Sequence, residues 1–237
     1  MNDSTFRFKQ FSIAQDKCAM KVGTDAVLLG SWVNAPESQS VLDIGTGTGI
    51  IAMMIAQKTD AIIDAIDIDE KALEQARYNA LNSIWKHRIN IFHISLQNHA
   101  KHIDKKYDLI ISNPPYFDET YKPAEVSRNN ARHTDNLSFG DLAEGVRKLL
   151  EPHGKFFVIL PLNEGNIFIE IMKTEGLFCN ELVRVKSKIS KPEKRLMMQF
   201  SFTKTELKES MLIIRNEDHS YSDEYINLTK DYYVSLK

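Results

Sequence analysis

Three glycines at alternate positions carry the clearest chemical signal in the sequence. Gly45, Gly47 and Gly49 follow directly on a short apolar run, and Asp43 stands two positions before the first of them. Glycines between a strand and a helix allow the backbone to turn sharply and to approach a ligand closely. The spacing is G-x-G-x-G, whereas the loop that presents a helix N-terminus to a pyrophosphate reads G-x-G-x-x-G. Because a carboxylate at Asp43 would repel a pyrophosphate, this loop favours a cationic ligand.

A second acid stands where a bound nucleoside would need it. Asp67 ends the next apolar run, about 20 residues beyond Gly45, where a carboxylate accepts ribose hydroxyls, and Asp69 is the alternative candidate. S-adenosylmethionine carries a sulfonium, an ammonium and a ribose but no phosphate, so it matches these acids. The same residues could form only a tight strand–helix turn with solvated acids. The order strand, acid, glycines, helix, strand, acid favours cofactor binding.

The segment Asn113-Pro114-Pro115-Tyr116 has the composition to recognise a planar amine. Two prolines stiffen the backbone and remove two N–H donors. The Asn113 side-chain oxygen and the Pro114 carbonyl can each accept one amine hydrogen, which localises the nitrogen lone pair for attack on the methyl of a sulfonium. Tyr116 can stack on the ring that carries the amine. A proline-rich turn is the alternative, but the preceding glycine loop favours methyl transfer by positioning and electrostatics.

Short apolar runs that alternate with helical patterns must position these residues, as in βαβ units. The expected strands are residues 41–44, 62–67, 89–94, 109–111 and 155–160. The expected helices are residues 50–57 and 70–81, a helix capped by Ser138 and Asp141, and residues 163–175.

After Gly176 two strand patterns, 196–203 and 211–214, have no full helix between them, which predicts antiparallel pairing. The sequence therefore predicts an α/β fold with an open, doubly wound, Rossmann-like sheet, mostly parallel with an antiparallel C-terminal edge. We expect one domain over residues 1–237, with 1–35 as an N-terminal extension and 216–237 as a C-terminal tail.

Composition excludes several classes of protein. The 30 Lys and Arg against 32 Asp and Glu give a formal net charge of -2, which excludes a protein that holds nucleic acid by bulk electrostatics. Cys18 and Cys179 are too few for a disulfide framework or a cysteine zinc site. His93, His99 and His102 lie close together in the sequence but lack a metal-binding motif, so no metal is expected. Without an apolar span or a secretory signal, we expect a cytoplasmic protein.

The glycine loop from Asp43 to Gly49 and the segment from Asn113 to Tyr116 together resemble the class I S-adenosylmethionine-dependent N-methyltransferases. Residues 21–30, 130–133 with 137–139, and 191–195 are similar to the bacterial enzymes that methylate N6 of adenine 37 in the valine tRNA anticodon loop. The resemblance covers nearly the whole chain. It implies a seven-stranded methyltransferase sheet, S-adenosyl-L-methionine as the cofactor, tRNA as the partner and a monomer.

The resemblance and the motifs imply three sets of site residues. The third strand of such enzymes usually ends in an acid that holds the cofactor adenine; residues 94–98 contain none, and Gln97 or Asn98 would replace it. The catalytic set is Asn113, Pro114, Pro115 and Tyr116. The cofactor set is Lys21, Thr24, Asp43, Gly45, Gly47, Gly49, Asp67, Ile68, Leu96 and Gln97. The substrate-binding set is Phe117, Arg128, Arg132, His133, Lys191, Lys194 and Arg195.

A basic C-terminal stretch could give a near-neutral chain an RNA surface. Residues 184–208 contain eight Lys and Arg against two Glu, and aromatic and basic residues also alternate after Tyr116. Such interleaving suits a splayed single-stranded loop better than a duplex. Each of these lysines could equally be a solvated surface residue, so clustering beside the pocket is the deciding observation.

Several other functions share the same chemistry. A ribosomal RNA guanine-N2 methyltransferase fits the size and the motifs. A protein-glutamine N5-methyltransferase usually carries a helical domain before the cofactor loop, and a DNA adenine methyltransferase needs a target-recognition domain; this chain has little room for either. A non-catalytic RNA-binding module is the alternative from another class, which the intact Asn113 to Tyr116 segment disfavours.

Overall fold

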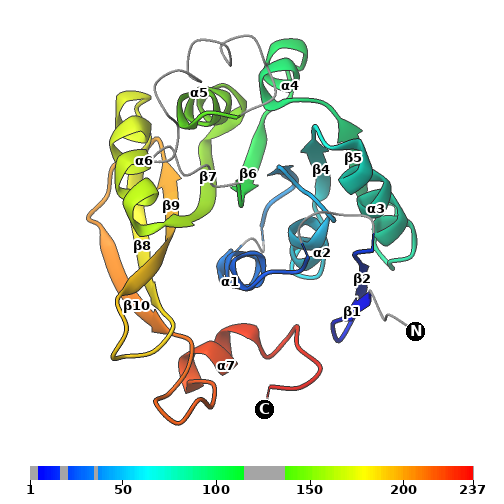
Figure 1. Cartoon of the computed structure of the whole chain (residues 1–237). Helices are drawn as coiled ribbons and strands as arrows, with labels where there is room; N and C mark the ends of the chain where they lie inside the picture. The colour runs from blue at the N-terminus through cyan, green and yellow to red at the C-terminus, as the bar shows by residue number, and fades with distance from the viewer. Residues whose placement is uncertain (1–4, 17–20, 35–36, 115–136, 237) are drawn as a thin grey trace, which may run out of the picture.

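The described residues form one mixed sheet of eight strands between two layers of helices (Figure 1). The computed structural model describes residues 5–16, 21–34, 37–114 and 137–236. In chain order, the strands of this sheet are β3 (Ser40–Ile44), β4 (Ile62–Asp67), β5 (Ile89–His93), β6 (Tyr107–Ser112), β7 (Leu150–Pro161), β8 (Phe178–Lys186), β9 (Glu193–Ser201) and β10 (Lys208–Ile213). A small antiparallel hairpin, β1 (Thr5–Arg7) with β2 (Ser12–Ala14), precedes them.

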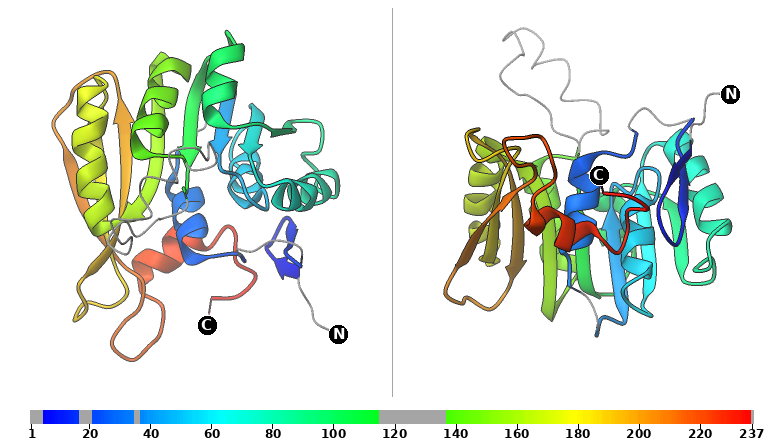
Figure 2. Two further views of the ribbon diagram at one scale, coloured as in Figure 1. Left: turned by 45° about the horizontal axis from the view of Figure 1, so that its top comes forward. Right: turned by 90° about the horizontal axis from the view of Figure 1, so that it is seen from below.

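Helices cover both faces of the sheet, as the alternating pattern predicted. The first core cluster joins α1, α2, α7 and the end of α3 to one face, and the second joins α4, α5 and α6 to the other. Figure 2 shows these layers from two further directions. The helices are α1 (Thr24–Trp32), α2 (Ile50–Ala56), α3 (Glu70–Leu81), α4 (Leu96–His102), α5 (Phe139–Leu149), α6 (Leu162–Thr174) and α7 (Asp223–Thr229). None of the helices seen in the described part of the chain has the length and apolarity to cross a bilayer.

Local capping explains where two of the predicted helices begin. The backbone N–H groups of Lys71 and Ala72 have no carbonyl partner within α3, because they lie in its first turn. The Asp69 side chain accepts a hydrogen bond from each of them. Ser138 and Asp141 form the reciprocal capping box of α5. Both helices therefore start where the sequence predicted, and α3 has the predicted bounds of 70–81.

The order in which the chain lays down its strands reverses direction at β3. The order is β10-β8-β9-β7-β6-β3-β4-β5, and strands β3 to β7 are parallel to one another. The chain winds outward from β3 through β4 to β5, and then resumes on the other side with β6 and β7. A crevice for a ligand opens at such a reversal, beyond the carboxyl ends of the strands.

The C-terminal end of the sheet differs in detail from the prediction. The resemblance implied seven strands, but the described chain has eight, because β10 adds beside β8 at the edge. Antiparallel pairing is present there, as expected, yet β9 alone among the eight runs against the others: it is antiparallel to both β7 and β8, while β10 is parallel to β8.

The two ends of the described chain pack against one another. Phe8 forms an isolated antiparallel bridge with Tyr233, and the Lys9 backbone N–H donates to the carbonyl of Tyr232 at 2.8 Å. The Tyr232 hydroxyl reaches the Met54 carbonyl of α2 at 3.0 Å. Helix α7 lies against α1 (Figure 2). The segments expected as an extension and a tail thus contribute Phe8 and Tyr232 to the core.

Candidate active site

Three adjacent strand ends bring the two predicted motifs together. The last residue of β3 is paired with the last residue of β6 on one side and with Ile66 of β4 on the other. Gly45 therefore emerges between Asp67, at the end of β4, and Asn113, just beyond β6. The structure thus places the glycine loop, the second acid and the start of the Asn113 segment at one point on the carboxyl edge.

The glycine loop needs its glycines for conformation and leaves open space beside them. Gly45 and Gly47 have φ angles of 70° and 55°, in the left-handed region that residues with a Cβ rarely adopt. A Cβ on either residue would have no atom of the described residues within 4 Å, apart from those of its own chain neighbours. The backbone N–H groups of Gly45 and Thr46 both donate to the Ile66 carbonyl, at 2.9 and 3.1 Å. The loop is therefore fixed to β4 with an open flank.

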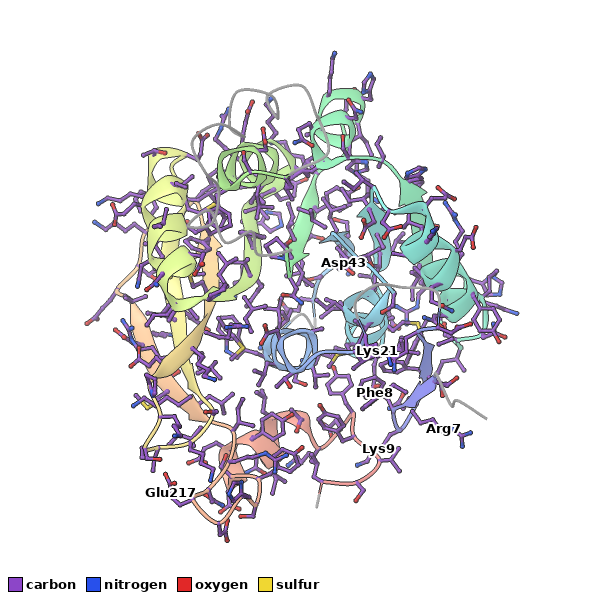
Figure 3. All side chains as sticks on the ribbon, in the orientation of Figure 1. Arg7, Phe8, Lys9, Lys21, Asp43 and Glu217 are labelled. Atoms are coloured by element: carbon purple, nitrogen blue, oxygen red, sulfur yellow. The ribbon has the colours of Figure 1, made fainter. Side chains whose placement is uncertain are left out.

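Asp43, which is labelled in Figure 3, is buried near the end of β3 beside this loop. Its Oδ2 accepts hydrogen bonds from the Thr46 hydroxyl at 2.6 Å and the Ala52 backbone N–H at 3.2 Å. Its Oδ1 is buried and has no hydrogen-bond partner among the described residues. Burial raises the pKa of Asp43 to about 7; the two hydrogen bonds act against this shift, and the charge of Asp67 adds to it. A cationic donor is the group that this oxygen lacks.

Asp67 closes the loop and keeps acceptor capacity. Its Oδ2 accepts from the Gly47 backbone N–H at 2.8 Å, and its Oδ1 accepts from the backbone N–H groups of Ile68 at 2.7 Å and Asp69 at 3.0 Å. A carboxylate offers about four lone-pair sites, so one remains for a ribose hydroxyl. Asp69, the alternative candidate, is occupied as the N-cap of α3. The geometry therefore favours Asp67 of the two.

The remaining predicted cofactor residues differ in what they can offer. Ile68 is half-exposed next to Asp67, and Gln97 is exposed in the first turn of α4. The Leu96 side chain is buried in the core beneath α5, so only its backbone can face a ligand. Lys21 is exposed, and Thr24 begins α1 after Gly23, an N-cap without a side-chain hydrogen bond.

Two of the four predicted catalytic residues lie in the described part of the chain. Asn113 is partly buried and engaged in an interaction within the protein, and Pro114 is buried beside it. The other predicted catalytic and substrate-binding residues of the segment after β6 lie outside the described residues. These are Pro115, Tyr116, Phe117, Arg128, Arg132 and His133.

The basic stretch divides into paired and exposed side chains. Arg184 binds two acids, Glu193 at 2.9 Å and Glu209, so it does not add to an RNA surface as its inclusion in the count suggested. Lys191 and Lys194 are exposed. They lie at and just after the β8–β9 turn, on the same edge of the sheet as the glycine loop, because β9 runs against β7. Lys191 and Lys194 are therefore the exposed lysines of this stretch that the structure describes on the glycine-loop edge.

Asn79 is a buried polar residue that sequence reasoning missed. Its side-chain amide donates to the carbonyls of Ala14 at 3.1 Å and Thr48 at 2.9 Å, and its oxygen accepts from the Ala14 N–H at 2.9 Å. It thereby ties the N-terminal hairpin to the glycine loop. The signal available was an asparagine between Ala76 and Ala80 on the apolar stripe of α3.

The three histidines do not form a common site. His93 is exposed and pairs with Glu70 at 2.5 Å. His99 is buried, with its Nε2 2.9 Å from the Tyr107 hydroxyl. Within the part of the chain that the structure describes, no group of three or more His, Cys, Asp or Glu side chains is arranged to hold a metal ion.

Comparison with known proteins identifies the family. The model of the family "Methyltransferase small domain" matches residues 18–160. The tRNA1(Val) (adenine(37)-N6)-methyltransferase of Bacteroides fragilis strain YCH46 is 44% identical over 237 residues, which is all of both chains. The protein of the same name from Trichodesmium erythraeum is also 44% identical, over 99% of both chains.

Solved structures agree on the fold. A predicted O-methyltransferase from Agrobacterium tumefaciens matches with a TM-score of 0.70 at 18% identity, over 90% of this chain and 99% of its own. The ribosomal protein L11 methylase of Lactobacillus delbrueckii matches with a TM-score of 0.51 at 20% identity, over 74% of this chain and 76% of its own. At these identities the likeness shows the Rossmann-like methyltransferase fold. Together with the full-length relatives it establishes that this chain belongs to the tRNA1(Val) (adenine(37)-N6)-methyltransferase family.

Proposed function

We propose that this protein transfers a methyl group from S-adenosyl-L-methionine to the N6 amine of adenine 37 in valine tRNA. The observation that carries the proposal is the meeting of Asp43, the open glycine loop and Asn113 at three adjacent strand ends. The full-length relatives, which bear the name of this activity, support the choice of substrate.

The chain's own residues fit the proposed cofactor. The unsatisfied Oδ1 of Asp43 offers a buried anionic acceptor for an ammonium group, directly or through a water. Asp67 would accept from the ribose, and the open flanks of Gly45 and Gly47 leave room for the body of the ligand. When bound, S-adenosylmethionine supplies an electrophilic methyl group on a sulfonium. Lys21, Thr24, Ile68, Leu96 and Gln97 complete the proposed binding set.

Asn113 and Pro114 would prepare the nucleophile. Each presents a carbonyl oxygen that accepts one hydrogen of the adenine amine, so the nitrogen lone pair is directed away from the ring plane. The proton leaves readily after transfer because the methylated ammonium is a strong acid, so no strong general base is needed. Pro115 would stiffen the segment, and Tyr116 would stack on the adenine. Rate then comes from positioning and electrostatics.

RNA would approach from the carboxyl edge of the sheet. Lys191 and Lys194 are the described basic residues proposed to face it, with Arg195 beside them. Phe117, Arg128, Arg132 and His133 are proposed to contact the splayed loop. We further propose that the protein acts as one domain, as a cytoplasmic monomer; light scattering coupled to gel filtration would check its mass in solution.

One experiment tests the substrate and the product together. Purified protein is incubated with labelled S-adenosylmethionine and, separately, unmodified valine tRNA, bulk ribosomal RNA and protein extract. Nucleoside mass spectrometry should find N6-methyladenosine in the tRNA alone, and a transcript with adenine 37 changed to guanine should accept no label. N2-methylguanosine in ribosomal RNA, methylated glutamine in protein, or RNA binding without turnover would each overturn the proposal.

A further inference from the structure

Arg195 joins two segments that are 170 residues apart in the sequence. Its Nε donates to Oδ2 of Asp25 at 2.8 Å, and its Nη1 donates to the carbonyl of Lys194 at 3.0 Å. Both side chains of the ion pair are only partly exposed, 31% for Arg195 and 24% for Asp25. The guanidinium is therefore already held by a carboxylate, and an RNA phosphate would have to compete with it.

Asp25 offers a rigid attachment point. It lies in the first turn of α1, where the helix dipole favours a negative charge. The next six residues of α1, 26–31, are buried. At the other end of the helix, Lys58 donates to the carbonyls of Ser31 at 2.5 Å and Val33 at 2.7 Å. Helix α1 is thus fixed at both ends.

The β8–β9 turn, residues 187–192, is also held from its other side. Lys188 donates to the Glu217 carbonyl at 3.0 Å, and the Ser190 backbone N–H donates to the Glu217 carboxylate at 3.1 Å. Glu217 lies at the periphery of the molecule, in the loop that follows β10 (Figure 3). Two anchors, Glu217 and the Arg195–Asp25 pair, therefore flank the exposed Lys191 and Lys194.

We propose that Arg195 is a positioning residue, which ties the β8–β9 turn to α1 so that Lys191 and Lys194 meet the RNA backbone. This assignment rests on the proposed function, since it requires a bound tRNA. It differs from the role expected from the sequence, in which Arg195 itself contacts RNA. Lys191 and Lys194 keep that role.

The salt dependence of binding separates the two roles. Binding of unmodified valine tRNA to the full chain is measured between about 50 and 200 mM salt. The slope of log K against log salt is negative, and each lost phosphate contact reduces its magnitude by about 0.7–0.9. Lys191→Gln and Lys194→Gln should each reduce the magnitude by that amount. Arg195→Gln should weaken binding about two- to fivefold, as expected of one surface ion pair, and leave the slope unchanged, because bound RNA would still order the turn and contact the same two lysines.

The partner residue gives the sharper test. Asp25→Asn removes a negative charge beside the RNA surface, yet it should weaken binding about as much as Arg195→Gln, and the double variant should lose no more than either single variant. Arg195→Lys keeps the charge but cannot make both hydrogen bonds, so it should also bind more weakly than the wild type.

Arg147→Gln is the matched control, because Arg147 Nε binds Glu175 at the same distance of 2.8 Å, between the C-terminal ends of α5 and α6. It should change neither affinity nor slope, and thermal melting should show that every variant is folded. A reduced slope for Arg195→Gln, wild-type binding by Arg195→Lys, or tighter binding by Asp25→Asn would overturn the assignment. Failure of the wild type to bind or methylate tRNA would instead overturn the proposed function.

Discussion

Asp43 shows how a single side chain can place a functional requirement in conflict with stability. Its carboxylate is buried, one oxygen is satisfied by Thr46 and Ala52, and the other is not. The protein therefore keeps a group whose charged form is disfavoured in the folded state. A cationic ligand would stabilise the charged carboxylate. The same buried carboxylate therefore lowers the stability of the ligand-free protein and provides the proposed binding contact.

Asp43 should make the stability of the ligand-free protein fall as pH rises. Its pKa is about 7 in the folded state and near the ordinary aspartate value of 3.8 in the unfolded state, so the folded state binds more protons between these values. The free energy of unfolding should decrease through that window by up to about 1.4 kcal/mol per pH unit. Urea unfolding of the wild type and Asp43→Asn at several pH values checks this. The variant should lack this part of the slope; equal slopes would contradict the assignment.

The same substitution should weaken cofactor binding. Asp43→Asn keeps an acceptor for Thr46 and Ala52 but places an amide donor where the ammonium would sit. Loss of a charge-assisted hydrogen bond predicts a Kd for S-adenosylmethionine about 10- to 100-fold higher at pH 8. In the wild type the affinity should rise from pH 6 to pH 8 as Asp43 ionises. Calorimetry measures both, and a Kd unaffected by pH and by the substitution would refute the proposed contact.

Asn113 should affect the chemical step far more than cofactor binding. Asn113→Ala removes one of the two proposed acceptors for the amine hydrogens, so kcat should drop about 100- to 1,000-fold, the usual loss for one preorganised hydrogen bond at a reacting centre. Cofactor affinity should stay within a few-fold. Single-turnover methylation and cofactor titration separate the two effects. Unchanged turnover would remove Asn113 from the mechanism.

The role of an individual residue can be predicted from the sequence when it depends on residues nearby in the chain. Asp43 and Asp67 were predicted from their spacing to the glycines, and both lie beside the glycine loop. The pairing of Arg195 with Asp25 could not be predicted, because only the assembled sheet and α1 bring them together. Burial of the Leu96 side chain was missed for the same reason.

Helix α3 connects two elements through one buried amide. Asn79→Asp would place a carboxylate against the carbonyls of Ala14 and Thr48, where the amide now donates. Loss of these bonds and the new repulsion should cost about 2–4 kcal/mol of stability and weaken cofactor binding, since Thr48 belongs to the glycine loop. Urea unfolding and calorimetry measure the two effects.

Asn82→Asp is the control for this prediction. Asn82 follows α3 as its C-cap residue and is exposed, and its side-chain amide donates to the Tyr78 carbonyl at 2.8 Å. It should change stability by no more than about 0.5 kcal/mol, as is usual for surface positions. Similar losses for the two variants would mean that the charge change, and not the link between hairpin and loop, is responsible.

Elements with strong local signals were predicted well, and those defined by their partners were not. Strand β4 and helix α3 have the predicted bounds, because a short, mostly apolar run and an apolar stripe at helical spacing are each recognisable from the local sequence. Strand β8 was missed because Asn180, Glu181 and Arg184 interrupt its pattern. In the structure Asn180 donates to the Ser201 hydroxyl, and Arg184 pairs with Glu193 and Glu209. The direction of β10 was not predicted, because it is set by pairing with β8 and not by the residues of β10 itself.

The whole molecule is closed by contacts between its two ends. Tyr232 is 2% exposed, packs in the core and donates to the Met54 carbonyl. Tyr232→Ala should cost about 3–5 kcal/mol, the range for loss of a large buried aromatic side chain. Val234→Ala, at a position with 64% of the residue exposed, should change stability by no more than about 0.5 kcal/mol. Thermal melting of both variants checks this; equal melting temperatures would show that the C-terminal segment is not part of the cooperative unit.

The closing contacts also impose an order of assembly. Lys9 donates to the carbonyl of Lys230, 221 residues further along the chain, and Phe8 pairs with Tyr233. Asn79 of α3 holds the β2 side of the hairpin, but the residues that pack against Phe8 and Lys9 follow all eight strands of the sheet in the chain. Contacts of such long sequence separation form late in folding. The segment at Phe8 and Lys9 is thus among the last parts of the fold to be immobilised, so nascent chains should expose Phe8 until Tyr233 has emerged.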